Sequence, residues 1–271
     1  MTSEPVEISP SEWERPPGRV ACGTPRILGD DLAQRELILV GTVHRDPEGF
    51  GKLAGLLARE RPTAVAVEVS PYGLLFRCRE GRRLRRRLER RLRRWAKARG
   101  DAWQSWGQLL AIDRQLALPF EYRAALRYCR DTGVPLSPID LSSWSREAIQ
   151  NQWPQMVSPE NLRLISAEPP EVLCLVVRRD YEMAARLLHE PAQSLVPAFL
   201  RSCTADPAWE EREAVLAAKV AELFGEMQVG RLVYVGGWQH LVGSRGCGTL
   251  YERLEHLRPR RVLLADFAEG G

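Results

Sequence analysis

The stretches LILVGTVH (residues 37–44) and RPTAVAVE (residues 61–68) decide the fold. In each stretch a short, unbroken apolar run ends abruptly, the first at Gly41 and the second at Glu68. Such runs are typical of strands that are buried on both faces, as in a parallel sheet. Apolar residues between the stretches recur at helical spacing over 47–61. We therefore predict a β-α-β unit whose two strands pair in parallel, with a right-handed crossover.

Further runs extend this pattern along the chain. We expect strands at 134–139, 232–235 and 261–264, and helices at 77–99, 103–118, 121–131, 173–188, 210–224 and 250–257. The strand at 134–139 contains two prolines, which favours a short strand at an edge of the sheet. The predicted class is α/β, with a mixed, largely parallel sheet, flanking helices and a helical insert.

One folded domain accounts for most of the chain. A length of 271 residues suits a single α/β unit with one sizeable core. Five prolines within residues 1–33 predict an extended or flexible N-terminal arm, and residues 34–271 then form the α/β domain. The helical insert spans about 74–118. We expect a tight, glycine-rich turn at 243–248.

Basic residues are concentrated in one predicted helix. Residues 77–99 contain twelve arginines and one lysine against two glutamates, although the whole chain has a net charge of only +4. Such a helix favours an anionic partner, either nucleic acid or an acidic membrane surface. The alternative is a solvated helix face, because arginine stems also cover apolar surface well.

The cysteines and the N-terminus indicate a cytoplasmic protein. Six scattered cysteines form no C-x-x-C pair, which excludes a zinc ribbon and a thioredoxin-like motif and suits a reducing compartment. The N-terminus lacks the order of a signal peptide, and we find no apolar run that could span a membrane. The chain also lacks a credible phosphate-binding loop and a serine-hydrolase elbow.

Two of the four histidines follow predicted strands in the same local frame. The segments Gly41-Thr42-Val43-His44 and Gly237-Trp238-Gln239-His240 both have the form strand-Gly-x-x-His. Glycine lets the chain turn sharply off the end of a buried strand, and the imidazole then lies over the edge of the sheet. Histidine is the commonest metal ligand and the usual proton shuttle near neutral pH.

Carboxylates follow two further predicted strands. Glu68 ends the strand at 64–67, and Asp140 ends the strand at 134–139. Together with His44 and His240, Glu68 forms a set that could bind a divalent ion such as Mn²⁺, Co²⁺ or Zn²⁺. The alternative is structural: Glu68 caps a helix or pairs with an arginine, and the histidines are hydrogen-bonded turn residues.

The order of these motifs resembles the TraB/PrgY family, which is grouped with the Tiki, GumN, erythromycin-esterase and ChaN-like proteins. The resemblance covers roughly residues 36–265 and is faint between 142 and 205. The matching segments are LILVGTVH (37–44), RPTAVAVE (61–68), PFEYRAALRYCRDTGVPLSPID (119–140), EEREAVLAAKV (210–220) and RLVYVGGWQHLVG (231–243).

The resemblance implies a cleft between the two Gly-x-x-His motifs. It places His44, Glu68, Arg212 and His240 in the site, together with Asp140 and Glu121. With the motifs themselves, we expect metal ligands at His44, Glu68 and His240 and catalytic groups at Glu68, Arg212 and Asp140. We expect substrate contacts at Thr42, Gly237, Trp238 and Glu121. Arg212 would hold a substrate carboxylate or stabilise an oxyanion. The implied activity is metal-dependent, protease-like hydrolysis of a peptide, amide or ester bond.

Two other functions remain open at this point. One is a regulatory protein that sequesters a peptide or haem in the same cleft without turnover. The other is an adaptor that binds nucleic acid or membrane through the arginine-rich helix. The substrate of the hydrolase would be a small peptide or another small molecule, and self-association into a homo-oligomer is left open as well.

Overall fold

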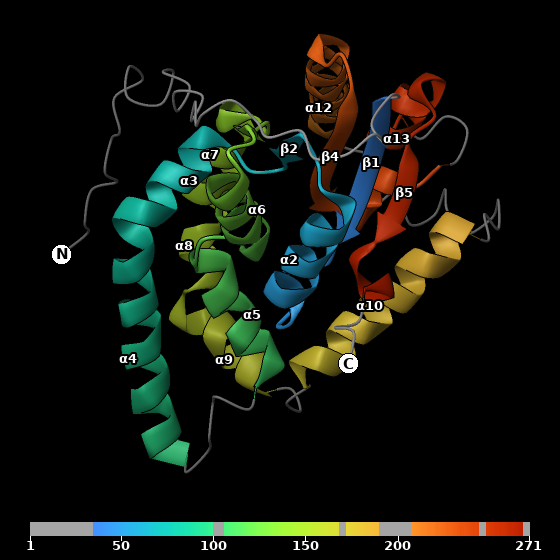
Figure 1. The fold of residues 1–271 in the computed structure, drawn as a ribbon. Coiled ribbons are helices and arrows are strands. Elements are labelled where there is room, and N and C mark those ends of the chain that lie inside the picture. Colours follow the sequence, from blue (N-terminus) through green and yellow to red (C-terminus); the bar gives the residue numbers. More distant parts are fainter. Residues whose placement is uncertain (1–34, 100–105, 168–171, 190–206, 244–247, 268–271) are drawn as a thin grey trace.

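The computed structural model describes residues 35–99, 106–167, 172–189, 207–243 and 248–267. The predicted arm at 1–33 lies outside these residues, as does most of the predicted turn at 243–248. The described residues form an α/β domain in which a parallel sheet is flanked by helices (Figure 1).

Five strands build the sheet in the order β3-β2-β4-β1-β5, and every neighbouring pair is parallel. The strands are β1 (Arg35–Thr42), β2 (Ala64–Val67), β3 (Leu136–Pro138), β4 (Gly230–Gly237) and β5 (Arg260–Leu263). The α/β class is confirmed. The expected mixed character of the sheet is wrong for the described residues, because no antiparallel strand joins it. The short, proline-containing β3 lies at an edge, as predicted.

The prediction that the first two strands pair with each other is also wrong. β4 lies between β1 and β2 and pairs with both. β4 is the central strand of the sheet, and its residues 232–235 are fully buried. Local sequence could not reveal this insertion, because β4 arrives from the far end of the chain.

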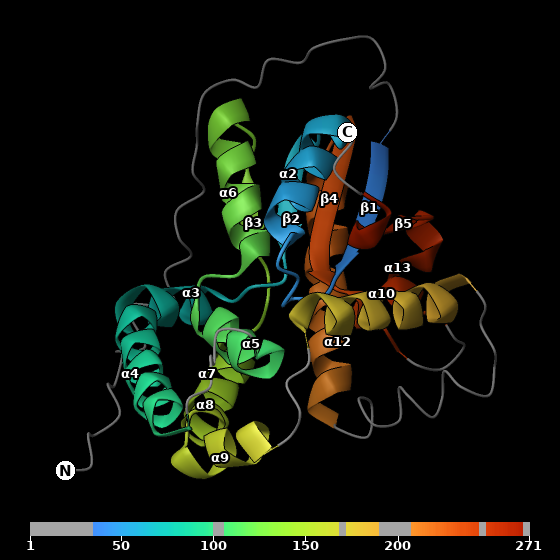
Figure 2. The ribbon, with the colours of Figure 1, turned by 90° about the horizontal axis from the view of Figure 1, so that it is seen from below.

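Helices cover both faces of the sheet (Figures 1 and 2). α2 (Gly49–Glu60) and α6 (Phe120–Thr132) pack together on one face, and α12 (Pro207–Glu226) and α13 (Leu250–Leu254) pack on the other. The apolar side of α2 is fully buried at Leu53, Leu56 and Leu57. This two-sided cover explains why the strands are continuously apolar.

The remaining helices lie beyond the carboxyl ends of the strands (Figure 2). They are α3 (Pro71–Phe76), α4 (Arg82–Arg99), α5 (Gly107–Leu116), α7 (Ser142–Asn151), α8 (Trp153–Met156), α9 (Pro159–Ala167) and α10 (Leu173–His189). A π-helical segment, Arg77–Gly81, joins α3 to α4. In both views α4 stands at the outer edge of the molecule (Figures 1 and 2).

The arginine-rich α4 is anchored by a narrow apolar stripe. Leu88 and Leu92 are 2% exposed and belong to a second core cluster, which is formed with α5 and with helices from 142–167. The arginines lie on the outer side, and Arg85 pairs with Asp113 of α5. Among the described residues, no helix is long and apolar enough to cross a membrane.

Candidate functional site

The two Gly-x-x-His motifs leave the sheet side by side. β1 and β4 are neighbours, and their register places Thr42 opposite Gly237. After β4 the chain turns at once into a 3-10 helix, Trp238–Leu241, which carries His240. Gly237 allows the two motifs to approach closely, because a Cβ there would lie 3.1 Å from Nε2 of His44. The two histidines thus reach one edge of the sheet from adjacent strands.

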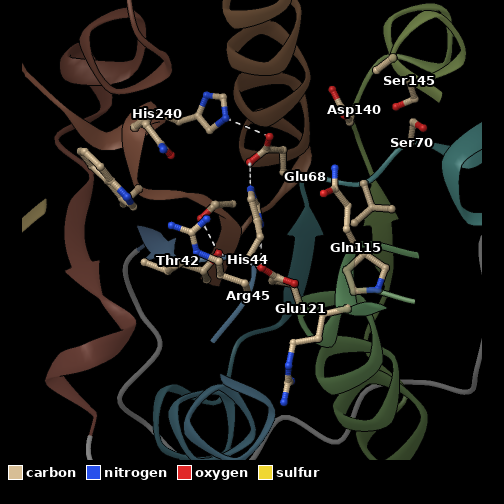
Figure 3. Close-up of a pocket in the computed structure, with 18 of the residues that line it drawn as sticks. Thr42, His44, Arg45, Glu68, Ser70, Gln115, Glu121, Asp140, Ser145 and His240 are labelled. Carbon is tan, nitrogen blue, oxygen red and sulfur yellow. Dashed lines mark hydrogen bonds and ion pairs between the residues drawn. The ribbon is translucent and has the colours of Figure 1, made fainter. Parts of the chain in front are cut away.

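Glu68 lies between the two imidazole rings (Figure 3). Nε2 of His240 lies 2.9 Å from Oε1 of Glu68, and Nε2 of His44 lies 3.9 Å from Oε2. The backbone N–H of Gly237 donates to Oε2 at 2.6 Å. Burial opposes ionisation of Glu68, but the charges of His240 and Arg212 lower its pKa well below 4.5. Glu68 is therefore a buried carboxylate at neutral pH.

His240 is a buried cation held between two carboxylates. Its Nδ1 contacts Glu213, and its Nε2 contacts Glu68. Burial disfavours the imidazolium, but Glu68 and Glu213 together raise the pKa of His240 to about 10. Trp209 stacks on the ring, with centroids 5.0 Å apart. At neutral pH His240 keeps both of its protons, which suits a fixed electrostatic role better than proton transfer.

His44 has the opposite character. Its Nδ1 donates to Oε1 of Glu121 at 2.8 Å, and 56% of its side-chain surface is exposed. Glu121 is 2% exposed and also accepts a hydrogen bond from Thr42 at 2.9 Å. Desolvation works against the charged ring, but the negative charge and the hydrogen bond of Glu121 raise the pKa of His44 above 6.5. In the resulting dyad, Nδ1 of His44 is held by Glu121, and Nε2 is accessible from the cavity.

Arg212 ties two of the predicted carboxylates together. Its Nε donates to Oδ1 of Asp140 at 2.8 Å, and its Nη2 bonds to both Asp140 and Glu68. The guanidinium also lies over the ring of Trp144, 4.1 Å from the centroid. With two nitrogens taken by protein carboxylates, Arg212 is arranged to hold Glu68 and Asp140 in place.

These side chains line one cavity of about 620 Å³. His44, Glu68, Arg212 and His240 are joined there by Thr42, Glu121, Asp140 and Trp238, and the backbone of Gly237 adjoins them. The wall opposite the sheet edge comes from α5, α7, α8 and α10. All the residues that the sequence nominated therefore gather in one region of the structure.

Two residues that contact His240, Glu213 and Trp209, were not identified as site residues from the sequence. Glu213 is fully buried, contacts His240 and accepts the backbone N–H of Leu250 at 2.6 Å. Trp209 stacks on His240 from the start of α12. Glu213 lies three and four residues before the buried Leu216 and Ala217, so helical periodicity places it on the core-facing side. A charged residue on the core-facing side of a helix is unusual, so the sequence could have identified Glu213 as a candidate site residue.

The metal site stays a prediction. Each histidine has its Nδ1 on a carboxylate, which is how metal-binding imidazoles are commonly oriented. However, the described residues contain no group of three or more His, Cys, Asp or Glu side chains that could hold an ion. Glu68 is already engaged by Arg212, His240 and Gly237. As arranged here, the three donors do not fit an ion.

Comparisons with known proteins leave the family open. No family model, no curated protein and no solved structure matches this chain.

Proposed function

We propose that this protein is a hydrolase of peptide, amide or ester bonds, with His44 as its general base and general acid. The observation that carries the proposal is the dyad of His44 and Glu121 at the cavity. A buried carboxylate that holds Nδ1 sets the tautomer and leaves Nε2 to accept a proton. The resemblance to the TraB/PrgY family points to the same reaction class.

The proposed reaction uses water as the nucleophile. Nε2 of His44 takes a proton from water while the water oxygen attacks the carbonyl carbon of the substrate. His44 then gives that proton to the leaving nitrogen or oxygen as its bond to the carbonyl carbon breaks. The buried charges of Glu68, Arg212 and His240 remain unchanged through the cycle and keep the edge of the cavity rigid.

Turnover of model substrates tests the proposal. Purified protein is incubated with p-nitrophenyl esters and with a library of short peptides, and products are followed by absorbance and by mass spectrometry. We expect hydrolysis by the wild type and none by His44→Asn. Binding of these compounds without any product would instead favour the sequestering protein, which shares the cavity but not the chemistry.

A second candidate function belongs to the outer surface of α4. Several of its arginines are exposed and have no acidic partner among the described residues, for example Arg82, Arg86 and Arg87. Such a row of charges supports binding to nucleic acid or to an acidic membrane. The adaptor predicts binding that weakens steeply as salt is raised, so binding that is insensitive to salt would rule it out.

A further inference from the structure

The charges that line the cavity do not balance. Four acidic side chains line it, and each one has a basic side chain of the same cavity as its partner. These pairs are Glu121 with His44, Glu68 and Asp140 with Arg212, and Asp180 with Arg45.

Two arginines of the same cavity, Arg77 and Arg114, have no acidic partner among the described residues. Among the described residues, Arg77 donates to backbone carbonyls alone, that of Gly73 at 3.2 Å and that of Gln115 at 3.2 Å. Its guanidinium lies 4.9 Å from the ring centroid of Trp153. These contacts orient the cation without pairing it directly with a carboxylate.

The packing of the insert brings the two arginines onto one wall. Arg77 begins the π-helical segment, and Gly81 ends it. A Cβ on Gly81 would lie 2.7 Å from the carbonyl oxygen of Leu116, so this segment packs tightly against the end of α5, which carries Arg114. Desolvation lowers the pKa of Arg77 to about 10, although Glu121 and Asp140 act in the opposite direction. The cation thus stays charged at neutral pH in a partly dehydrated place.

From this arrangement we infer that Arg77 and Arg114 form a subsite for a carboxylate of the substrate. The inference deepens the proposed function and rests on it for the identity of the ligand as a substrate. The proposed hydrolase would then act on molecules that carry a free carboxylate, such as a peptide with its C-terminus unblocked. Arg212, which resemblance to the family suggests for this role, is already held by two carboxylates of the protein.

A carboxylate fits this wall better than a phosphate. The guanidinium of Arg77 lies near the ring of Trp153 and is held by two backbone carbonyls. Its remaining N–H groups lie in one plane, where a carboxylate can accept two of them side by side. Glu121 and Asp140 are near enough to act on Arg77 electrostatically. They would repel a doubly charged phosphate more strongly than a singly charged carboxylate.

Binding of a matched pair of probes tests the inference without turnover. The probes are a dansyl-labelled dipeptide with a free C-terminal carboxylate and the same dipeptide as its C-terminal amide. Fluorescence anisotropy measures their affinity for the full chain carrying His44→Asn, so that hydrolysis does not interfere. We expect the acid to bind at least about tenfold more tightly than the amide, as a charge-assisted hydrogen bond would give.

Substitutions of Arg77 and Arg114 test whether these residues cause the difference in affinity between the acid and the amide. Arg77→Gln and Arg114→Gln should each weaken binding of the acid and leave binding of the amide unchanged. The control is Arg127→Gln, which removes an exposed arginine of α6 that does not line the cavity. Circular dichroism checks the fold of each variant. If Arg77→Gln does not fold, the affinity of Arg114→Gln for the acid alone tests the proposed carboxylate subsite.

Equal binding of acid and amide would overturn the inference, as would an equal loss in Arg77→Gln and Arg127→Gln. Inorganic phosphate that displaced the acid at lower concentration than acetate would assign the wall to phosphate instead. Failure of the proposed function looks different, because the wild type would then hydrolyse nothing while the preference for the acid persisted.

Discussion

Glu121 accepts a hydrogen bond from Nδ1 of His44 at 2.8 Å, although 77 residues separate the two in the chain. His44 follows β1, and Glu121 lies in the first turn of α6, which packs with α2 on the same face of the sheet. The contact therefore depends on how two helices and a strand are stacked. It turns an ordinary turn histidine into an oriented base.

Removal of the base should abolish hydrolysis while the fold survives. We expect His44→Asn to lower kcat by at least about 100-fold, because a positioned general base commonly accelerates a reaction by that factor or more. Because the ring is half exposed, the melting temperature should change little. The matched control is His256→Asn, an exposed histidine that does not line the cavity. An equal loss of activity in both variants would contradict the role given to His44.

The rate should rise with pH through the titration of His44. The base must be neutral to accept a proton, and Glu121 raises the pKa of His44 above 6.5. We therefore expect the acid limb of kcat/KM to have its midpoint above 6.5 and to move to lower pH in Glu121→Gln, where the carboxylate charge is absent. A midpoint that stays in place in this variant would show that another group controls the rate.

Stability should fall on both sides of a window near pH 4.5–6.5. The folded pKa of His240 is raised to about 10 from 6.5, so its contribution is complete below 6.5 and is lost as pH rises toward 10. The pKa of Glu68 is depressed, so its contribution is complete above 4.5 and is lost on acidification. Urea unfolding at a series of pH values measures this profile.

The variant His240→Gln isolates the alkaline side of that profile. It leaves Glu213 buried without its cation and takes one of two cationic partners from Glu68, which should cost about 3–5 kcal/mol of unfolding free energy at pH 6. The decline in stability between pH 7 and 10 should become shallower. A slope identical to that of the wild type would mean that His240 does not carry the proton assigned to it.

Chelation separates the proposed chemistry from metal-assisted hydrolysis. Because Glu68 and His240 are engaged by Arg212 and Glu213, we expect activity to persist in EDTA. Elemental analysis of untagged protein should give less than one Mn, Co or Zn per chain. Activity that EDTA removes and one of these ions restores would assign the reaction to an ion held by His44 and its neighbours.

Two glycines of α2 should respond to alanine with opposite signs. A Cβ on Gly49 would lie 2.4 Å from Cζ of Phe120, so Gly49→Ala overpacks the contact between α2 and α6 and should cost about 1–3 kcal/mol. A Cβ on Gly55 meets nothing within 4 Å, so Gly55→Ala should stabilise the helix by about 1 kcal/mol. Thermal unfolding of both variants checks the packing of the two helices.

The sequence alone determined the α/β class, most of the helices and strands, and the residues that gather at the site. These features are local: apolar runs define buried strands, and polar side chains directly after them must lie at the strand ends, which in a parallel sheet share one edge. Glycine at 41 and 237 and carboxylates at 68 and 140 were therefore readable in the chain itself.

Tertiary structure alone decided the order of the strands and the division of labour between the histidines. β4 lies between β1 and β2, although β1 and β4 have equally buried apolar runs, so no local signal encodes that order. Likewise, two identical motifs contain a half-exposed His44 and a buried His240, because Glu121 comes from α6 and Glu213 from α12. The physical reason is that burial and neighbouring charges set a pKa, and both depend on residues far away in the chain.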